Sequence, residues 1–197
     1  MKLWQMNQEK GDLGAVMPKE LQRAASLCGI SPIGVREVFH SANVDAISMQ
    51  IAKGGSPTVE TSRQVIPDFL IWVSMPIFSK RAASLAMELG CSSEEFWPCR
   101  FQTNPDESYF FHLPTKSFDI IDYEKSRFLM TIPGDPPLPM FIQEVKVKQI
   151  PDFIPSCFRA SIPGVSQVLL ELFVSDDFRN EWEQGRFSGA TFLEMSN

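Results

Sequence analysis

Two segments of the chain combine an apolar run of strand length with apolar positions at helical spacing. In the first, Phe69-Leu70-Ile71-Trp72-Val73 is an unbroken apolar run, which is typical of a strand buried on both faces. Apolar residues at helical spacing follow between Phe78 and Leu89. Ser74 is the expected N-cap of this helix, Pro76 lies in its first turn, and Gly90 ends it. The pattern therefore predicts a strand that leads directly into a helix.

The end of the chain has the same order of features. An apolar run from Val168 to Val174 precedes Ser175, the expected N-cap of a second helix, and Thr191–Leu193 is a predicted closing strand. Strand, Val-Ser, helix, glycine and aromatic strand thus occur twice, about 101 residues apart when Ser74 is matched with Ser175. Both an internal strand-helix-strand duplication and a chance recurrence are compatible with this pattern.

Shorter elements are predicted in the rest of the chain, so the fold class is α+β, with short-stranded, mostly antiparallel sheets and a few packed helices. Residues 1–60 are predicted to be an N-terminal portion and residues 61–197 an α+β domain, unless the two form one continuous globule. The other predicted elements are a helix from Pro18 to Gly29, strands at Val35–Phe39, Ala46–Ala52, Phe96–Phe101, Tyr109–Leu113, Phe118–Tyr123 and Phe141–Lys148, and a loop at Lys53–Thr58. Phe118–Tyr123 is expected to form a hairpin with Tyr109–Leu113.

The charge of the chain narrows the classes of partner. Eighteen Lys and Arg residues stand against 24 Asp and Glu residues, which gives a formal charge of −6. An acidic protein is unsuited to non-specific binding of nucleic acid or anionic membranes, and it suits a basic protein partner. No apolar stretch approaches the roughly 20 residues that span a bilayer, and the first ten residues lack the order of a secretion signal. We therefore expect a cytoplasmic protein, with reduced and mostly buried cysteines.

Candidate catalytic groups are few. The chain has two histidines, His40 and His112, and the nucleophile–base pairs considered are Cys157 or Cys99 with His112. Neither cysteine lies in a recognisable nucleophile motif. The chain also has no Cys-x-x-Cys or His-Glu-x-x-His metal motif, and Gly54-Gly55 lacks the rest of a phosphate-binding loop. We predict no enzyme, no cofactor and no metal site.

Acidic residues near turns and near aromatic residues form the remaining candidate site. Acids interleaved with aromatic side chains such as Trp97, Phe178 and Trp182 are typical of a protein-binding face, although the aromatics would equally fit a core. Between Glu171 and Glu194 there are six acids and two arginines. The candidate interface residues are Glu94, Glu95, Asp106, Glu107, Asp176, Asp177, Glu181 and Glu183.

Three segments of the chain resemble a bacterial family. They are Pro67 to Gly90, Asp119 to Phe128, and Leu172 to Phe178 followed by Gly189 to Phe192. Together, over about residues 67–194, they are similar to the Myxococcus-type immunity proteins of polymorphic-toxin systems, formerly a domain of unknown function. The shared motifs are strand ends and helix caps, so the resemblance carries over no catalytic residue.

The resemblance implies an immunity protein that binds and neutralises a cognate secreted antibacterial toxin. Such toxins take part in interbacterial competition and are delivered by a type VI or similar contact-dependent route. Together with the acidic charge, it implies a basic, cytosol-acting toxin domain whose active site or substrate approach is occluded. The alternative is a small-ligand-binding protein or an intracellular enzyme with a pocket between the two similar units.

Overall fold

The computed structural model describes most of the chain beyond residue 64, together with a strand near the N-terminus. The described residues are 2–9, 58–59, 65–72, 75–101, 104–114, 116–132, 138–148, 150–151, 153–161, 169 and 171–195. The predicted helix Pro18–Gly29, the predicted strands Val35–Phe39 and Ala46–Ala52, and residues 53–57 of the predicted loop lie outside the described residues.

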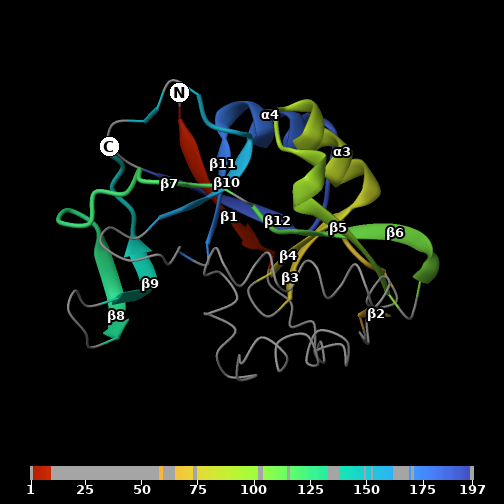
Figure 1. The fold of residues 1–197 in the computed structure, drawn as a ribbon, viewed down its shortest axis with the longest axis horizontal. Coiled ribbons are helices and arrows are strands. Elements are labelled where there is room, and N and C mark those ends of the chain that lie inside the picture. The colour runs from red at the N-terminus through yellow and green to blue at the C-terminus, as the bar shows by residue number, and fades with distance from the viewer. Residues whose placement is uncertain are drawn as a thin grey trace.

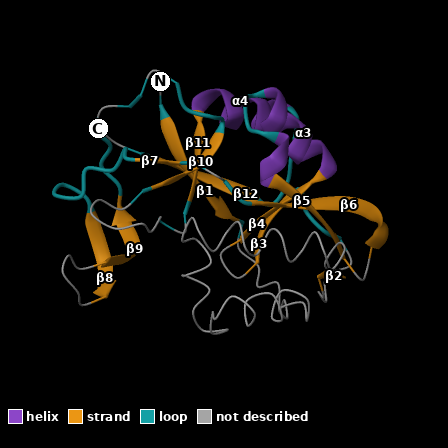
Figure 2. Ribbon diagram, viewed as in Figure 1, coloured by secondary structure: helices purple, strands orange, loops and turns teal. Residues whose placement is uncertain are grey.

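The described elements form an α+β fold with mostly antiparallel sheets, which confirms the predicted fold class (Figures 1 and 2). One sheet has the strand order β12-β1-β11-β10-β7, a second has the order β2-β5-β6-β4-β3, and β8 and β9 form a separate hairpin. The two α-helices of the described part of the chain, α3 and α4, lie together on one side of these sheets (Figure 1). No helix in the described part of the chain is both long and apolar enough to cross a membrane. In chain order the elements are β1 (Leu3–Gln8), β2 (Thr58–Val59), β3 (Phe69–Trp72), β4 (Met75–Ser79), α3 (Lys80–Glu88), the 3₁₀ turn η2 (Ser93–Glu95), β5 (Phe96–Phe101), β6 (Asn104–His112), β7 (Ser117–Phe118), β8 (Arg127–Ile132), β9 (Leu138–Glu144), β10 (Cys157–Ala160), β11 (Leu172–Ser175), α4 (Asp176–Gln184) and β12 (Ala190–Glu194).

The two large sheets contain the same arrangement of four strands and one helix. In the first repeat the strand order is β5-β6-β4-β3 and α3 joins β4 to β5; in the second it is β12-β1-β11-β10 and α4 joins β11 to β12. All the pairings within these two sets are antiparallel. The fold therefore contains an internal structural repeat, but it matches different residues from the repeat in the sequence pattern.

The helix caps fix the offset between the repeats at 96 residues, because the equivalent N-caps are Ser79 and Ser175. The Ser79 side chain accepts a hydrogen bond from the backbone N–H of Ala82, and the Ser175 side chain accepts one from Phe178. The predicted cap at Ser74, and with it the offset of about 101, is therefore wrong. Met75–Ser79 is instead strand β4, which forms a hairpin with β3 before the helix begins.

The C-terminal ends of the helices repeat at the same offset. Leu89 donates to the Leu85 carbonyl, and Gly185 donates to the Glu181 carbonyl in the same way. The next residue in each repeat has a left-handed backbone, with φ of 102° at Gly90 and 51° at Arg186. Two helix ends with the same hydrogen bonds and the same backbone turn show that the repeat extends to local geometry.

The second repeat takes one central strand from the beginning of the chain. β6 follows β5 directly in the first repeat, whereas its counterpart β1 precedes every other described element. β1 lies between β12 and β11, with Trp4 paired to Glu194 on one side and Val174 on the other. Residues 3–8 of the predicted N-terminal portion therefore lie in the sheet of the second repeat.

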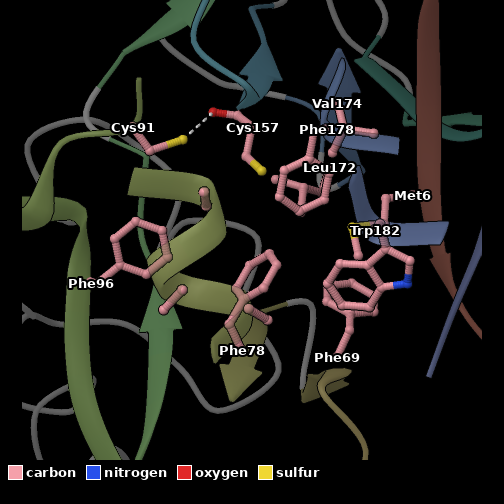
Figure 3. Close-up of a cluster of buried hydrophobic side chains, with 13 residues drawn as sticks. Met6, Phe69, Phe78, Cys91, Phe96, Cys157, Leu172, Val174, Phe178 and Trp182 are labelled. Carbon is pink, nitrogen blue, oxygen red and sulfur yellow. Dashed lines mark hydrogen bonds between the residues drawn. The ribbon is translucent and has the colours of Figure 1, made fainter. Parts of the chain in front are cut away.

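A hydrophobic core lies between the two repeats and contains residues of both (Figure 3). The helices are complementary at equivalent positions, since α3 buries Ala82 and Ala86 where α4 buries Phe178 and Trp182. The small side chains of α3 thus leave room for the aromatic rings of α4. Trp182 also meets Phe69 of β3 edge to face, with ring centroids 6.4 Å apart, so each repeat packs directly on the other.

Several predicted strands differ from the structure in partner or extent. Phe118–Tyr123 forms no hairpin with the preceding strand; only Ser117–Phe118 is a strand, and it pairs in parallel with Arg159 and Ala160 of β10. Ile120 and Ile121 instead enter a second core on the opposite face of the β1 sheet, with Leu3, Phe158 and Phe173. The predicted Phe141–Lys148 strand is shifted to Leu138–Glu144. The apolar run before Ser175 forms a strand only from Leu172.

Candidate functional site

Three side chains of different chemistry converge where the first repeat meets the second. They are Cys91, Glu95 and His112, and one potential metal-ligating atom from each lies within 4.8 Å of those from the other two. Their exposed fractions are 6%, 6% and 0%. The Cys91 sulfur lies 3.6 Å from the carbonyl oxygen of Cys157, which belongs to the second repeat (Figure 3). We refer to Cys91, Glu95 and His112 as the buried polar cluster.

Local backbone structure brings the cluster together. Cys91 follows the left-handed Gly90 at the end of α3, and its N–H donates to the Ala86 carbonyl. Glu95 is the last residue of η2 and adjoins Phe96, the strand partner of His112. The Leu113 N–H also donates to the Glu95 carbonyl. Strand pairing therefore holds Glu95 beside His112, and the turn after α3 brings Cys91 to them.

The neighbouring groups change the proton affinities within the cluster. The Cys157 and His112 side chains lower the pKa of Cys91 to about 4, against the effect of burial, which alone would raise it. Burial would lower the pKa of His112, but the Cys91 and Glu95 side chains raise it. The His112 Nε2 atom lies 3.6 Å from the Glu95 carboxylate. The arrangement favours charged forms of groups that are almost fully enclosed.

The sequence identified His112 but not its sulfur partner. Cys99 lies on β5 and is not part of the cluster, and Cys157 contributes a backbone oxygen close to the Cys91 sulfur. The sequence analysis paired His112 with Cys157 or Cys99, whereas the structure places the side chain of Cys91 beside it. A usable signal was present, because Cys91 and Glu95 are four residues apart around a turn that leads into an aromatic strand. The strand register that adds His112 was not readable from the sequence.

Chemically, the cluster can hold a cation, or it can hold a thiolate beside an imidazole and a carboxylate as in cysteine hydrolases. The second activity needs access for a substrate at the sulfur. All three side chains are less than a tenth exposed, so a substrate reaches Cys91 only if the surrounding structure opens.

The eight predicted interface acids fall into two groups, one in each repeat. Glu94, Asp106 and Glu107 are exposed in the first repeat, and Asp177, Glu181 and Glu183 are exposed in the second. Asp176 is half-buried, and its carboxylate accepts a hydrogen bond of 2.8 Å from the Trp4 indole. Glu95 is buried in the cluster and is not a surface residue.

The aromatic residues predicted beside these acids differ in exposure. Phe178 and Trp182 are 0% and 2% exposed and belong to the core between the repeats. The interpretation that placed them on a binding face is therefore wrong for both. Trp97 is half-buried on β5. The amphipathic helix α4 buries its aromatic residues and presents its acids to solvent, as the spacing of a surface helix requires.

An ionic junction around Asp68 also connects the two repeats, and no pattern in the sequence predicts it. The Asp68 carboxylate accepts hydrogen bonds from Arg81 and Ser79 of its own repeat and from the Ser188 backbone and side chain of the other. The Arg81 guanidinium in turn donates to the Gly185 carbonyl and lies 4.2 Å from the centre of the Phe187 ring. Burial alone would raise the pKa of Asp68, but these hydrogen bonds lower it to about 2.

The two chain segments approach closely at this junction. Gly189 has φ of 91°, and a side-chain carbon there would overlap the Phe69 carbonyl oxygen and the Pro67 ring. Glycine at this position is therefore required by both backbone conformation and space.

In comparisons with known proteins, no family model matches the chain, and no curated protein matches it.

Proposed function

We propose that this protein is an immunity protein that binds and neutralises a cognate secreted antibacterial toxin in the cytoplasm. The resemblance of residues 67–194 to Myxococcus-type immunity proteins and the formal charge of −6 support this function. The toxin would be a basic, cytosol-acting domain delivered by a type VI or similar contact-dependent route. Binding would occlude its active site or the approach of its substrate, without chemistry on the toxin.

The observation that carries the proposal is the acidic exposed face of α4. Four acids and Arg179 give this nine-residue helix a charge of −3, whereas Lys80, Arg81 and Glu88 give the equivalent helix α3 a charge of +1. The two helices have the same length, a serine N-cap and the same place in the repeat. The fold therefore does not dictate the charge of α4, which leaves recognition as a reason for it.

The four acids of α4 differ in how their position suits the helix dipole, which favours negative charge in the first turn and disfavours it in the last. Asp176 and Asp177 occupy the first turn, where a negative charge is favourable. Glu181 and Glu183 lie in the last turn, where the helix dipole disfavours a negative charge by about 0.3–1 kcal/mol each. Arg179 compensates Glu183 through a 2.7 Å ion pair. Acids retained at a cost to the helix are suited to attract a basic partner.

A half-buried tryptophan lies beside this acidic face. The Trp4 indole donates to Asp176, and the Arg179 guanidinium lies 4.4 Å from the centre of its ring. Tryptophan and arginine often contribute most of the affinity in protein interfaces, while surrounding charges accelerate association. An interface of ordinary size would bury about 800 Å² on each partner and could include both features.

The test is a binding measurement with the toxic C-terminal domain of a large secreted protein encoded beside this chain's gene. Reversing two exposed acids of α4, with Asp177→Lys and Glu181→Lys, should weaken binding at low salt at least tenfold, mainly through slower association. The matched control carries Glu88→Lys and Glu124→Lys, which change the net charge equally at other exposed positions. Equal binding by the two double variants would remove α4 from the interface, and no binding by the wild type would count against the proposal itself.

The alternative function, an intracellular enzyme with its site between the repeats, is favoured by the buried polar cluster. Cys91, with its pKa lowered to about 4, would be the nucleophile and His112 its base. Alkylation of the native protein by iodoacetamide separates the two functions. Rapid modification of Cys91 would favour the enzyme, whereas modification only on unfolding agrees with its 6% exposure and with a binding protein.

A further inference from the structure

The buried polar cluster contains the three kinds of side chain that hold zinc in proteins. A thiolate, an imidazole and a carboxylate, supplied by Cys91, His112 and Glu95, are all established zinc ligands. The set includes sulfur and nitrogen, so it is unsuited to calcium or magnesium, which prefer oxygen ligands. We propose that these three residues bind a zinc ion that ties the end of α3 to β6.

The distance between the His112 and Glu95 side chains fits two ligands of one metal ion better than it fits a hydrogen bond. The His112 Nε2 atom and the Glu95 carboxylate oxygen are 3.6 Å apart, beyond the usual hydrogen-bond range of about 2.7–3.2 Å. Nitrogen and oxygen ligands at zinc distances, in tetrahedral geometry, lie about 3.4 Å apart. The third ligand atom, the Cys91 sulfur, is within 4.8 Å of both, so side-chain rotations can bring the three residues onto three of the four tetrahedral positions of one zinc ion.

The burial of His112 gives independent support. Its side chain is fully buried, and neither ring nitrogen has a hydrogen-bond partner among the described residues. Buried polar groups without such a partner are rare, because each forfeits its hydration. A metal ion bound to one ring nitrogen satisfies that atom.

The charges of this ligand set match that of a zinc dication. As zinc ligands, the Cys91 thiolate and the Glu95 carboxylate carry two negative charges, and zinc with a neutral His112 imidazole makes the enclosed cluster neutral. The Ser156 hydroxyl of the second repeat, 3.3 Å from the Cys91 sulfur, also supports this ligand from outside the set.

The internal repeat shows that packing does not require these polar groups. At the 96-residue offset and in the equivalent strand register, the counterparts of Cys91, Glu95 and His112 are Phe187, Thr191 and Met6. Phe187 and Met6 pack into the core between the repeats. In the second repeat the apolar side chains of Phe187 and Met6 therefore replace Cys91 and His112, and the exposed Thr191 replaces Glu95, so the cluster is a specific feature of the first repeat.

The test is metal content combined with cobalt substitution. The wild-type chain, stripped with a chelator and dialysed against zinc, should retain one zinc per chain and melt at a higher temperature than the stripped protein. Cobalt should give the thiolate-to-metal absorption band of a cysteine ligand. Cys91→Ser should abolish that band, whereas Cys99→Ser, at a buried cysteine outside the cluster, should preserve it.

A second variant covers the case in which Cys91→Ser fails to fold. Glu95→Gln keeps the shape of the side chain and removes its charge, so it should fold and bind zinc at least tenfold more weakly. Retention of no zinc above the buffer background by the wild type would overturn the proposal. Equal zinc affinity in the wild type and Glu95→Gln, or an unchanged cobalt band in Cys91→Ser, would also overturn it.

Discussion

Arg186 occupies a left-handed backbone position that its counterpart fills with glycine. Its φ of 51° is unfavourable for a residue with a side chain, whereas Gly90 adopts φ of 102° without that penalty. The two positions make equivalent hydrogen bonds at the ends of α4 and α3. The second repeat therefore retains a small local strain that the first does not have.

Arg186→Gly should stabilise the protein by about 0.5–1 kcal/mol, because it removes this strain and keeps the backbone hydrogen bonds. Thermal unfolding should shift upward by about 1–4 °C. The matched variant Gly90→Ala should shift it downward, although a side-chain carbon at Gly90 meets no atom within 4 Å. A downward shift in Arg186→Gly would contradict the conformational account.

The ionic junction around Asp68 joins the start of helix α3 to the end of helix α4. Asp68 receives hydrogen bonds from Ser79, Arg81 and Ser188, which come from both repeats. The carboxylate is almost entirely enclosed, while the arginine is about half exposed. We therefore expect this junction to make the free energy of unfolding decrease at acidic pH.

Because the pKa of Asp68 is lowered to about 2 in the folded protein, its ionised form stabilises the fold above the unfolded pKa of 3.8. This contribution, about 1–2 kcal/mol after allowance for solvent screening, should disappear as the pH falls from about 4 to about 2. Urea unfolding across this range should show the loss in the wild type. Asp68→Asn should be less stable at pH 7 and lose less stability on acidification.

The control for this prediction is Asp119→Asn, which breaks an exposed 2.6 Å ion pair with Lys148. Exposed pairs contribute little, so its acid dependence should match that of the wild type. If Asp68→Asn lost as much stability as the wild type between about pH 4 and about pH 2, the loss would come from other carboxylates and the prediction would be wrong.

The two helices show which sequence patterns are sufficient to predict where a helix begins. The helix after Ser175 was predicted correctly, because a serine cap, two acids and spaced aromatic residues agreed. Ser74 and Ser79 both follow apolar residues, and only the pairing of β4 with β3 decides that the helix begins after Ser79. Pro76 fits this strand because it precedes Ile77, the first residue of β4 that pairs with β6.

Contacts between distant segments were beyond prediction from the sequence. The parallel pairing of Ser117–Phe118 with β10 joins segments about 40 residues apart without a local signal. The buried polar cluster likewise depends on the register that sets Phe96 against His112. Hydrophobic periodicity identifies which residues are buried, but it does not determine which buried residues meet.

The two repeats of the molecule differ in chain order, because the strand that comes last in the first repeat has its counterpart at the start of the chain. β1 takes the place of β6 in the second repeat, and its Leu3 carbonyl accepts a hydrogen bond from the Met195 N–H beyond β12. The beginning of β1 and the end of β12 are therefore neighbours. In the first repeat the same connection, between β5 and β6, is two residues long.

Moving residues 2–9 to a position after Met195, through a short linker, should restore the order of the first repeat and leave the fold intact. Deleting these residues should abolish cooperative unfolding, since β1 is the strand between β12 and β11. Circular dichroism and thermal melting distinguish the two chains. A permuted chain as disordered as the deletion would contradict the equivalence of β1 and β6.

A protein that neutralises a toxin should protect living cells that contain this toxin. The measurement is the growth of a susceptible bacterium that expresses the toxic domain encoded beside this gene, with and without the protein. The wild type and the Glu88→Lys, Glu124→Lys control should restore growth, whereas Asp177→Lys with Glu181→Lys should restore it poorly. If the wild type relieves the toxicity of no neighbouring effector, this protein is not an immunity protein.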